Sequence, residues 1–316
     1  MRTREELLKK ASLAVKNKNK KGLLEINKEA KQNGYFDLAF YILGLIERVN
    51  ERNDHAIEFF QKALEINPED LKVLNALGTA YYKCGRYEEA IQVFLDSLKH
   101  GGKKEVFLYN LGLAYKLSGK YREAISSLAQ VIETDRDFLP GYVSVCETAF
   151  TLNKMDTCRN YADLAYDNFS DKEDKRADLA KLMDVVGMYH YSRGDYDSAI
   201  SYSDKAISLL DTAVFHANRG SYLSSLRKFD EALAEYETAL AMDDKLGLAY
   251  YNRAETLYAG GDMKGAIENL SKAVELDEHF FEMAKGEKKF RHLRISRVQT
   301  KEGLLKALSK KLHKMK

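Results

Sequence analysis

A period of 34 residues constrains this chain more than any other feature. Three Leu-Gly pairs, ending at Gly44, Gly78 and Gly112, follow one another at that interval. An alanine comes twelve residues after each glycine, and the same twelve-residue interval occurs three more times further along. Those later pairs are Gly187 with Ala199, Gly220 with Ala232 and Ala254 with Ala266. Self-similarity of this kind predicts a stack of copies of one structural unit.

Each unit reads as two helices joined by a tight turn. An aromatic residue precedes the alanine by three positions, and a large residue follows it by four, so apolar side chains share one helical face. The aromatic positions are Tyr87, Tyr121, Tyr196 and Phe229, and the large positions are Phe60, Phe94, Leu128, Tyr236 and Leu270. Glycines at Gly85, Gly119, Gly194 and Gly261 lie between the two helices, where a turn favours positive φ.

The order of these signals is Leu-Gly, aromatic, Ala, large residue and a second small residue, with a closing proline at Pro68 in one copy. This pattern resembles the tetratricopeptide repeat family. The resemblance covers about residues 37–280 and implies an all-α fold: a right-handed α-solenoid of helix-turn-helix repeats with terminal capping helices.

The spacing predicts five segments. Residues 1–36 form a degenerate N-terminal helix pair, 37–172 hold repeats 1–4, 173–179 are a charged insertion, 180–280 hold repeats 5–7, and 281–316 form basic capping helices. The insertion is either a lengthened helix end or an exposed loop. It is a hinge between two half-solenoids or an ordinary tolerated insertion.

Charge is distributed unevenly along the chain, although the formal net charge is only +2. Residues 281–316 carry +9 and residues 1–33 carry +6, which leaves −13 on the residues between them. A nucleic-acid groove running the length of the chain is therefore disfavoured. We expect no secretory signal and no transmembrane segment, and three cysteines are consistent with a reducing cytoplasm.

The sequence shows no catalytic or metal-binding constellation. Its seven histidines lack metal-ligand spacing, so we expect no metal and no cofactor. Cys146 and Cys158 occupy small-residue positions of the fourth repeat, and Cys84 precedes the turn glycine Gly85. The run that begins at Gly101 lacks the spacing of a phosphate loop and reads as a helix C-cap. We therefore expect a protein that is not an enzyme.

The resemblance implies that the first helix of each repeat lines a concave groove where ligands dock. Projected by helical period, the predicted groove residues are Tyr41, Ile42, Leu45, Asn75, Tyr82, Tyr109, Asn110, Leu113, Asn218, Tyr251, Asn252 and Tyr258. Asn110, Asn218 and Asn252 hold equivalent positions, where a side-chain amide can pair with the backbone of an extended peptide. The tyrosines and leucines can equally pack between repeats. We predict a protein- or peptide-binding adaptor or scaffold.

Some repeats of this family bind the acidic C-terminus of heat-shock chaperones by combining asparagine with lysine and arginine from flanking repeats. The places flanking Asn218 hold Asp184, Met188, Leu248 and Asn252. Those around Asn110 hold Asn75, Thr79, Pro140 and Ser144. Neither set supplies the cations, so we expect no chaperone-type carboxylate clamp.

The basic C-terminal end leaves two alternatives open. Leu304, Leu305, Leu308 and Leu312 recur at helical spacing, with Lys306, Lys310, Lys311 and Lys314 between them. Such a helix either caps the solenoid or contacts nucleic acid, acidic lipid or an acidic protein. A peptide-sensing regulatory protein is a further alternative, but the N-terminal segment shows no DNA-binding helix-turn-helix pattern.

Overall fold

The computed structural model describes residues 2–101, 104–286 and 300–314. Within these ranges every regular element is a helix, which confirms the prediction of an all-α fold built from helix-turn-helix repeats. The chain divides into two compact units, Met1–Tyr161 (unit 1) and Ala162–Lys316 (unit 2), and the division falls within one helix.

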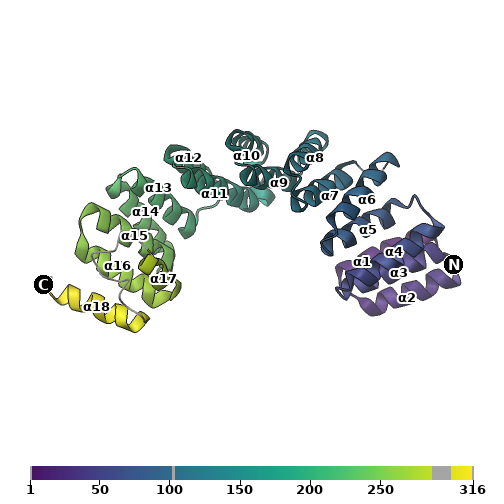
Figure 1. The fold of residues 1–316 in the computed structure, drawn as a ribbon, viewed down its shortest axis with the longest axis horizontal. Helices are drawn as coiled ribbons and strands as arrows, with labels where there is room; N and C mark the ends of the chain where they lie inside the picture. Colours follow the sequence, from purple (N-terminus) through teal and green to yellow (C-terminus); the bar gives the residue numbers. More distant parts are fainter. Residues whose placement is uncertain (1, 102–103, 287–299, 315–316) are drawn as a thin grey trace. The chain divides into compact units, whose positions relative to one another are not determined.

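In unit 1 successive helices pair with their neighbours through short turns (Figure 1). Its helices are α1 (Arg4–Lys16), α2 (Lys20–Gln32), α3 (Phe36–Val49), α4 (Asn53–Ile66), α5 (Leu71–Lys83), α6 (Tyr87–Lys99), α7 (Lys104–Leu117), α8 (Tyr121–Thr134) and α9 (Leu139–Thr151). The division between the units lies within α10 (Met155–Phe169).

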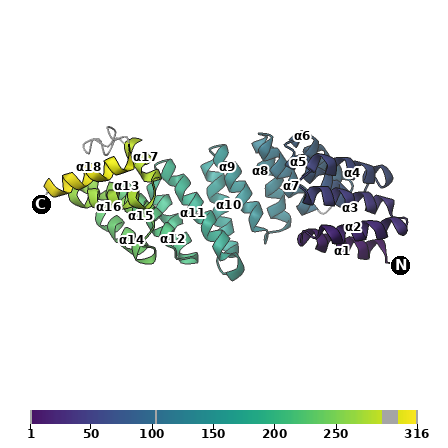
Figure 2. The same ribbon diagram turned by 90° about the horizontal axis from the view of Figure 1, so that it is seen from below.

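Unit 2 continues in the same way, with neighbouring helices side by side in both ribbon views (Figure 2). It contains the 3-10 turn η1 (Glu173–Lys175) and then α11 (Arg176–Ser192), α12 (Tyr196–Leu209), α13 (Ala213–Ser225), α14 (Phe229–Met242), α15 (Gly247–Gly260), α16 (Met263–Leu276), α17 (His279–Gly286) and α18 (Lys301–Lys314). The segment predicted as a charged insertion holds η1 and the first turn of α11. The five-segment division itself stays a prediction.

The two helices of a repeat approach most closely at the small residues that mark the period. A Cβ atom added at Gly78 would overlap the ring of Phe94, so the first helix can accept the ring only where it has no side chain. A Cβ atom added at Gly44, Gly112 or Gly220 would likewise overlap the side chain of Phe60, Leu128 or Tyr236, respectively. The period of the sequence is therefore the period of this contact.

The fourth repeat makes its close approach with two cysteines. Cys146 and Cys158 are both buried free thiols, and the Cys146 Sγ donates to the backbone oxygen of Cys158 over 3.5 Å. Their role as small apolar residues at a helix contact follows from this burial.

The turns within the repeats have the predicted left-handed backbone. Gly85, Gly119, Gly194 and Gly261 have φ of 76°, 80°, 78° and 93°, which confirms that prediction. Glu51, Asn153 and Arg227 adopt φ near 60° in the corresponding turns of other repeats, where glycine has the lowest conformational cost and asparagine is better tolerated than most other residues.

The N-terminal helix pair is joined to the repeats by an ion-pair cluster. Arg4 of α1 donates to Asp37 in the first turn of α3 and to Asp70, the N-cap of α5. Asn27 of α2 also donates to the backbone oxygen of Ala39 over 2.6 Å. These bonds fix α1 and α2 against α3 and α5 within unit 1.

The C-terminal helix α18 buries its leucines against the last repeat. Leu304 and Leu308 are each 1% exposed and join a cluster with Ile267, Leu270 and Val274 of α16. Lys306 and Lys310 are exposed on the other side of the helix. This is the arrangement of a capping helix. Most basic residues of the segment before it, from Lys288 to Arg297, lie outside the described residues.

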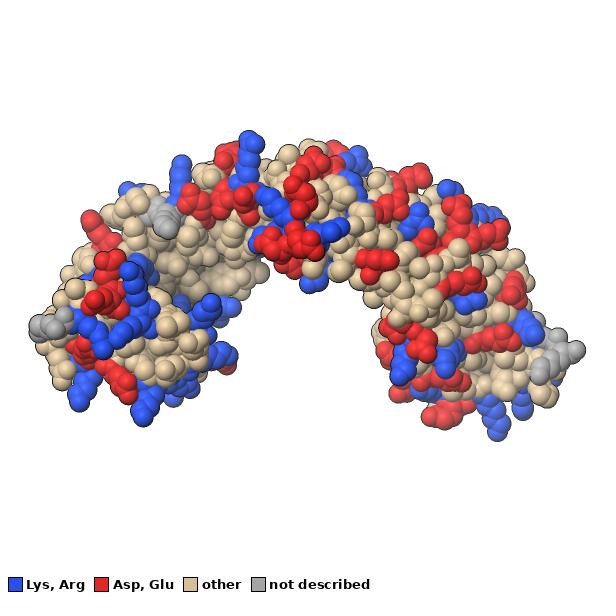
Figure 3. Space-filling model, turned by 180° about the vertical axis from the view of Figure 1, so that it is seen from behind, with Lys and Arg blue, Asp and Glu red and all other residues tan. Residues whose placement is uncertain are grey.

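Charges of both signs are interspersed over the face drawn in Figure 3, next to wide uncharged areas. No helix in the described part of the chain is long and apolar enough to cross a membrane.

A paired substitution separates the capping role of α18 from a binding role. We expect Leu304→Ala with Leu308→Ala to lower the free energy of unfolding by about 2–5 kcal/mol per site, because each change opens a cavity against α16. The matched pair Lys306→Ala with Lys310→Ala should change it by less than about 0.5 kcal/mol. Urea unfolding followed by circular dichroism measures both. Equal effects of the two pairs would contradict the capping role.

Candidate functional site

The described residues of unit 1 include two neighbouring cavities on the exposed side of α7. Both have Asn110 in their walls, and each has a volume of about 270 Å³. One lies between α5, α6 and α7 and is called the α5–α7 cavity. The other lies between α7, the end of α8 and the residue before α9, and is called the α7–α9 cavity.

The two cavities flank a pair of side-chain amides. The Asn110 Nδ2 donates to the Asn75 Oδ1 over 2.8 Å, which joins the first helices of two successive repeats. Within the described residues, no hydrogen bond is made by the Asn75 Nδ2 or the Asn110 Oδ1. This amide pair therefore presents one free donor and one free acceptor, the two groups needed to bond the N–H and C=O of an extended backbone.

The α5–α7 cavity is mainly apolar. Thr79, Tyr82, Phe94, Asn110 and Leu113 line it together with one cation, Lys83. Tyr82 is fixed edge-on against Tyr87, with ring centroids 6.0 Å apart. The hydroxyl of Thr79 is already satisfied by the backbone oxygen of Asn75, 2.7 Å away. A large apolar side chain would lose most of its water-exposed surface here.

The tyrosine of this cavity stays neutral. Burial raises the pKa of Tyr82 above its ordinary value, and the neighbouring phenols of Tyr87 and Tyr109 raise it further. The hydroxyl thus keeps its proton and serves as both donor and acceptor at neutral pH.

The α7–α9 cavity combines apolar walls with two carboxylates. Val106 and Tyr109 of α7, Val131 of α8 and Phe138 supply the walls. Tyr109 and Phe138 meet edge to face, with centroids 4.9 Å apart and planes at 84°. Glu105 in the first turn of α7 and Asp135 at the end of α8 are the charged members of the lining.

An apolar stripe along α7 connects the cavities. Val106, Tyr109, Leu113 and Leu117 follow at steps of three and four residues, and so share one helical face. Val106 is 43% exposed and Leu117 is 47% exposed. Exposed apolar side chains next to cavities favour a binding surface.

Several predicted groove residues do come together in unit 1. Asn75, Tyr82, Tyr109, Asn110 and Leu113 line the cavities or the amide pair. Tyr41 is half-buried on α3 against Phe60, with ring centroids 5.9 Å apart, and lines neither cavity.

Three predicted groove residues belong to the core instead. Ile42, Leu45 and Tyr251 are 0%, 2% and 2% exposed. Ile42 and Leu45 face the packed neighbours of α3, and Tyr251 stacks on Phe280 at 5.4 Å. Their side chains cannot reach a ligand, so their assignment to a groove surface is corrected.

Most of the lining residues were not among the groove residues predicted from the sequence. Val106, Val131, Asp135 and Phe138 were not predicted as site residues, nor were Lys83, Phe94 and Glu105. Asp135 and Phe138 lie in the connection between one repeat and the next. The 34-residue period locates this connection in the sequence, but it does not describe the path of the connection past α7.

In unit 2 the predicted polar residues are placed differently. The Asn218 Nδ2 donates to the Asp184 Oδ1 over 2.9 Å, so α13 and α11 are joined by an amide and a carboxylate. Burial raises the pKa of Asp184, and the bond from Asn218 opposes that rise without cancelling it. Asn252 and Tyr258 are half-buried on α15, and Tyr258 packs against the cluster that contains α18.

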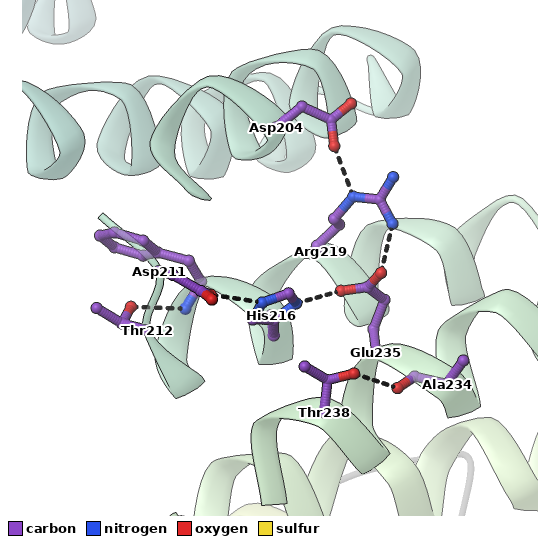
Figure 4. A network of polar contacts seen from close by, with 9 residues as sticks. Asp204, Asp211, Thr212, His216, Arg219, Ala234, Glu235 and Thr238 are labelled. Atoms are coloured by element: carbon purple, nitrogen blue, oxygen red, sulfur yellow. Dashed lines mark hydrogen bonds and ion pairs between the residues drawn. The ribbon is translucent and has the colours of Figure 1, made fainter. Parts of the chain in front are cut away.

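In unit 2, a separate network of charged and polar side chains consists of residues that bond one another (Figure 4). Arg219 donates to Asp204 and Glu235, and the two ring nitrogens of His216 bond Glu235 and Asp211 over 2.6 and 2.8 Å. These bonds connect α12, α13 and α14. Because each charge already has a partner of opposite sign or a hydrogen bond, the network stabilises the packing of the repeat.

Among residues 2–101, 104–286 and 300–314, no group of three or more histidine, cysteine, aspartate or glutamate side chains is placed to hold a metal ion. The basic residues predicted to contact a partner, Lys306, Lys310, Lys311 and Lys314, lie on α18 of unit 2, and none of them is a lining residue of either cavity.

Family models for the tetratricopeptide repeat match residues 50–108, 108–140 and 218–279. The chain is a tetratricopeptide repeat protein. Both cavities and the amide pair fall within the first two matched stretches, so the candidate site of this repeat protein is built from its repeats. No curated protein matches the chain by similarity.

Solved structures of other repeat proteins are similar to this one. The C-terminal part of a TPR repeat-containing protein from Cytophaga hutchinsonii is 15% identical, with a TM-score of 0.62 over 80% of this chain and 98% of that one. A tetratricopeptide repeat protein from Parabacteroides merdae is 16% identical, with a TM-score of 0.49 over 87% and 99%. The TPR2AB domain of yeast Sti1 in a complex with pHSP90 is 21% identical, with a TM-score of 0.32 over 87% and 99%. The first of these supports the fold.

The half-buried carboxylate of Asp184 leads to a pH-dependent expectation. Its pKa is raised in the folded chain, so its ionisation destabilises the fold as pH rises through that folded value. Asp184→Asn keeps an acceptor oxygen for Asn218 and removes the charge. We expect the variant to have a higher Tm than the parent at pH 7, and the difference to shrink as pH is lowered toward 4.5. A lower Tm at both pH values would contradict this account.

Proposed function

We propose that this repeat protein is a non-enzymatic adaptor or scaffold, and that it binds an extended segment of another protein on the exposed side of α5 and α7 in unit 1. The amide pair carries the proposal. Asn75 and Asn110 leave one donor and one acceptor free between two cavities, so backbone and side chains of one segment can be bound together.

The energetics of the surface support a peptide rather than a small molecule. Two adjacent cavities separated by a polar pair suit a chain that places side chains alternately along its length. Each anchored apolar side chain contributes about 1.5–3 kcal/mol. Because ordering a flexible segment opposes binding, two anchors and the backbone bonds are needed together.

The polar residues of unit 2 stay predictions. Asn218 already donates to Asp184, and Asn252 and Tyr258 lie on α15. We propose no joint site with unit 1. The burial of Leu304 and Leu308 favours a capping role for α18, so we do not propose nucleic-acid binding through its lysines.

We also propose a reducing compartment such as the cytoplasm. Cys84, Cys146 and Cys158 are free thiols, and the Cys146 Sγ bonds a backbone oxygen and not a second sulfur.

The test uses the full chain and a displayed library of random 12-residue peptides. Selected peptides are resynthesised with a dye, and their Kd is measured by fluorescence anisotropy. Asn110→Ala should raise Kd about tenfold or more, because it removes a bond to the peptide backbone and leaves that group unpaired.

Asn160→Ala is the matched control, since Asn160 is an exposed helical asparagine of the same unit outside both cavities. It should leave Kd unchanged, and circular dichroism should show equal helicity in both variants. If Asn110→Ala binds as the parent does, or if both variants weaken binding equally, the proposed site is wrong.

A further inference from the structure

We propose that the α7–α9 cavity is a subsite for an arginine side chain of the bound segment, and that the α5–α7 cavity takes a large apolar side chain two residues away. This inference rests on the proposed function, because it names the chemistry of the partner at the same site.

The walls of the α7–α9 cavity suit the aliphatic part of an arginine side chain. Val106, Val131 and the edge-to-face pair of Tyr109 and Phe138 offer apolar surface to its methylene groups. Aromatic rings also attract a guanidinium group, which stacks on their faces.

The two carboxylates of this cavity come from different elements, and no cation among the described residues pairs with either of them. Glu105 and Asp135 are half-buried, and within the described residues neither makes an ion pair. The neighbouring Lys104 and Arg136 are exposed and pair with neither of them. The backbone N–H of Asp137 donates to the Asp135 Oδ1 over 3.0 Å and fixes that carboxylate. A cation from a partner would complete the cavity.

The arrangement favours arginine over lysine. A planar guanidinium carries five N–H donors directed outward, so it can reach carboxylates on two sides of a cavity. An ammonium group is a compact and strongly hydrated charge that would have to lose more of its water for the same contacts.

The charge of the α5–α7 cavity disfavours the same side chain, although Lys83 is exposed and its charge is partly screened. Among the described residues, Lys83 is the only charged one that lines this cavity, and it makes no ion pair with any of them. A second cation there would be repelled, whereas Tyr82, Phe94 and Leu113 accept leucine or phenylalanine. The charges therefore fix which cavity takes which side chain.

The spacing of the two anchors follows from their shared wall. Because Asn110 lines both cavities, the anchors lie on either side of one amide. In an extended chain, residues i and i+2 point to the same side and are about 7 Å apart. We therefore expect an apolar residue and an arginine separated by one residue.

The test compares peptide selections on the parent chain and on a double variant. The probe is the displayed library of random 12-residue peptides used with the full chain. The parent should enrich an apolar residue and an arginine separated by one position. Glu105→Gln with Asp135→Asn should lose the arginine and keep the apolar residue. Glu123→Gln with Asp156→Asn is the control of equal charge change, placed on exposed residues outside the cavities, and should enrich what the parent does.

Affinities of one resynthesised peptide then measure the subsite. Replacing its arginine by glutamine should raise Kd about tenfold on the parent chain and leave it nearly unchanged on the double variant, because an ion pair needs both partners. Replacing arginine by lysine should raise Kd on the parent by about threefold.

The two proposals fail in different ways. Peptides that depend on Asn110 but show no arginine preference would overturn the subsite and leave the proposed function standing. A selection that enriches no peptide dependent on Asn110 would overturn both. Arginine enrichment that persists in the double variant would place the cation elsewhere and overturn the subsite alone.

Discussion

The rest of the structure depends on one contact, in which a large side chain of the second helix lies over a glycine of the first helix. Phe60, Phe94, Leu128 and Tyr236 each occupy space that a Cβ on the facing glycine would fill. Since interiors tolerate little change in volume, this contact fixes the distance between the helices of a repeat. In the fourth repeat Cys146 takes the place of the glycine, and it is again small and buried.

The short distance between the two helices of a repeat also positions the residues of the candidate site. Once each second helix is held close, the first helices of successive repeats lie near enough for Asn75 and Asn110 to hydrogen-bond across α5 and α7. The side of α7 that remains open carries Val106, Leu113 and Leu117. The site needs no loop insertion, because helices and one short connection build it.

The sequence was sufficient for the fold, and it also pointed to some of the residues that line the candidate cavities. The small residues give the register of the repeats. Projecting that register onto the first helix of each repeat predicts Asn75, Tyr82 and Leu113 as groove residues. The same projection failed for Ile42, Leu45 and Tyr251. The first helix of a repeat packs against its own second helix and against both neighbouring repeats, so only a narrow face of it stays open. Adjacent residues on a helix differ in direction by about 100°, so the neighbour of a residue on the open face can belong to the core. Tyr41 and Ile42 show that difference. Asp135 and Phe138 escaped prediction because their places depend on the path between α8 and α9, which periodicity alone does not describe.

The most direct measurement of the central claim is site-specific photocrosslinking in native lysate. A photoreactive phenylalanine replaces Leu113 in one chain and the exposed Gln92 of α6, outside both cavities, in another. Mass spectrometry then identifies the crosslinked segments. The account predicts that crosslinks from position 113 fall in extended segments of a small set of proteins and disappear with Asn110→Ala, and that position 92 yields none of them. The same partners at both positions, or crosslinks from position 113 that survive Asn110→Ala, would contradict it.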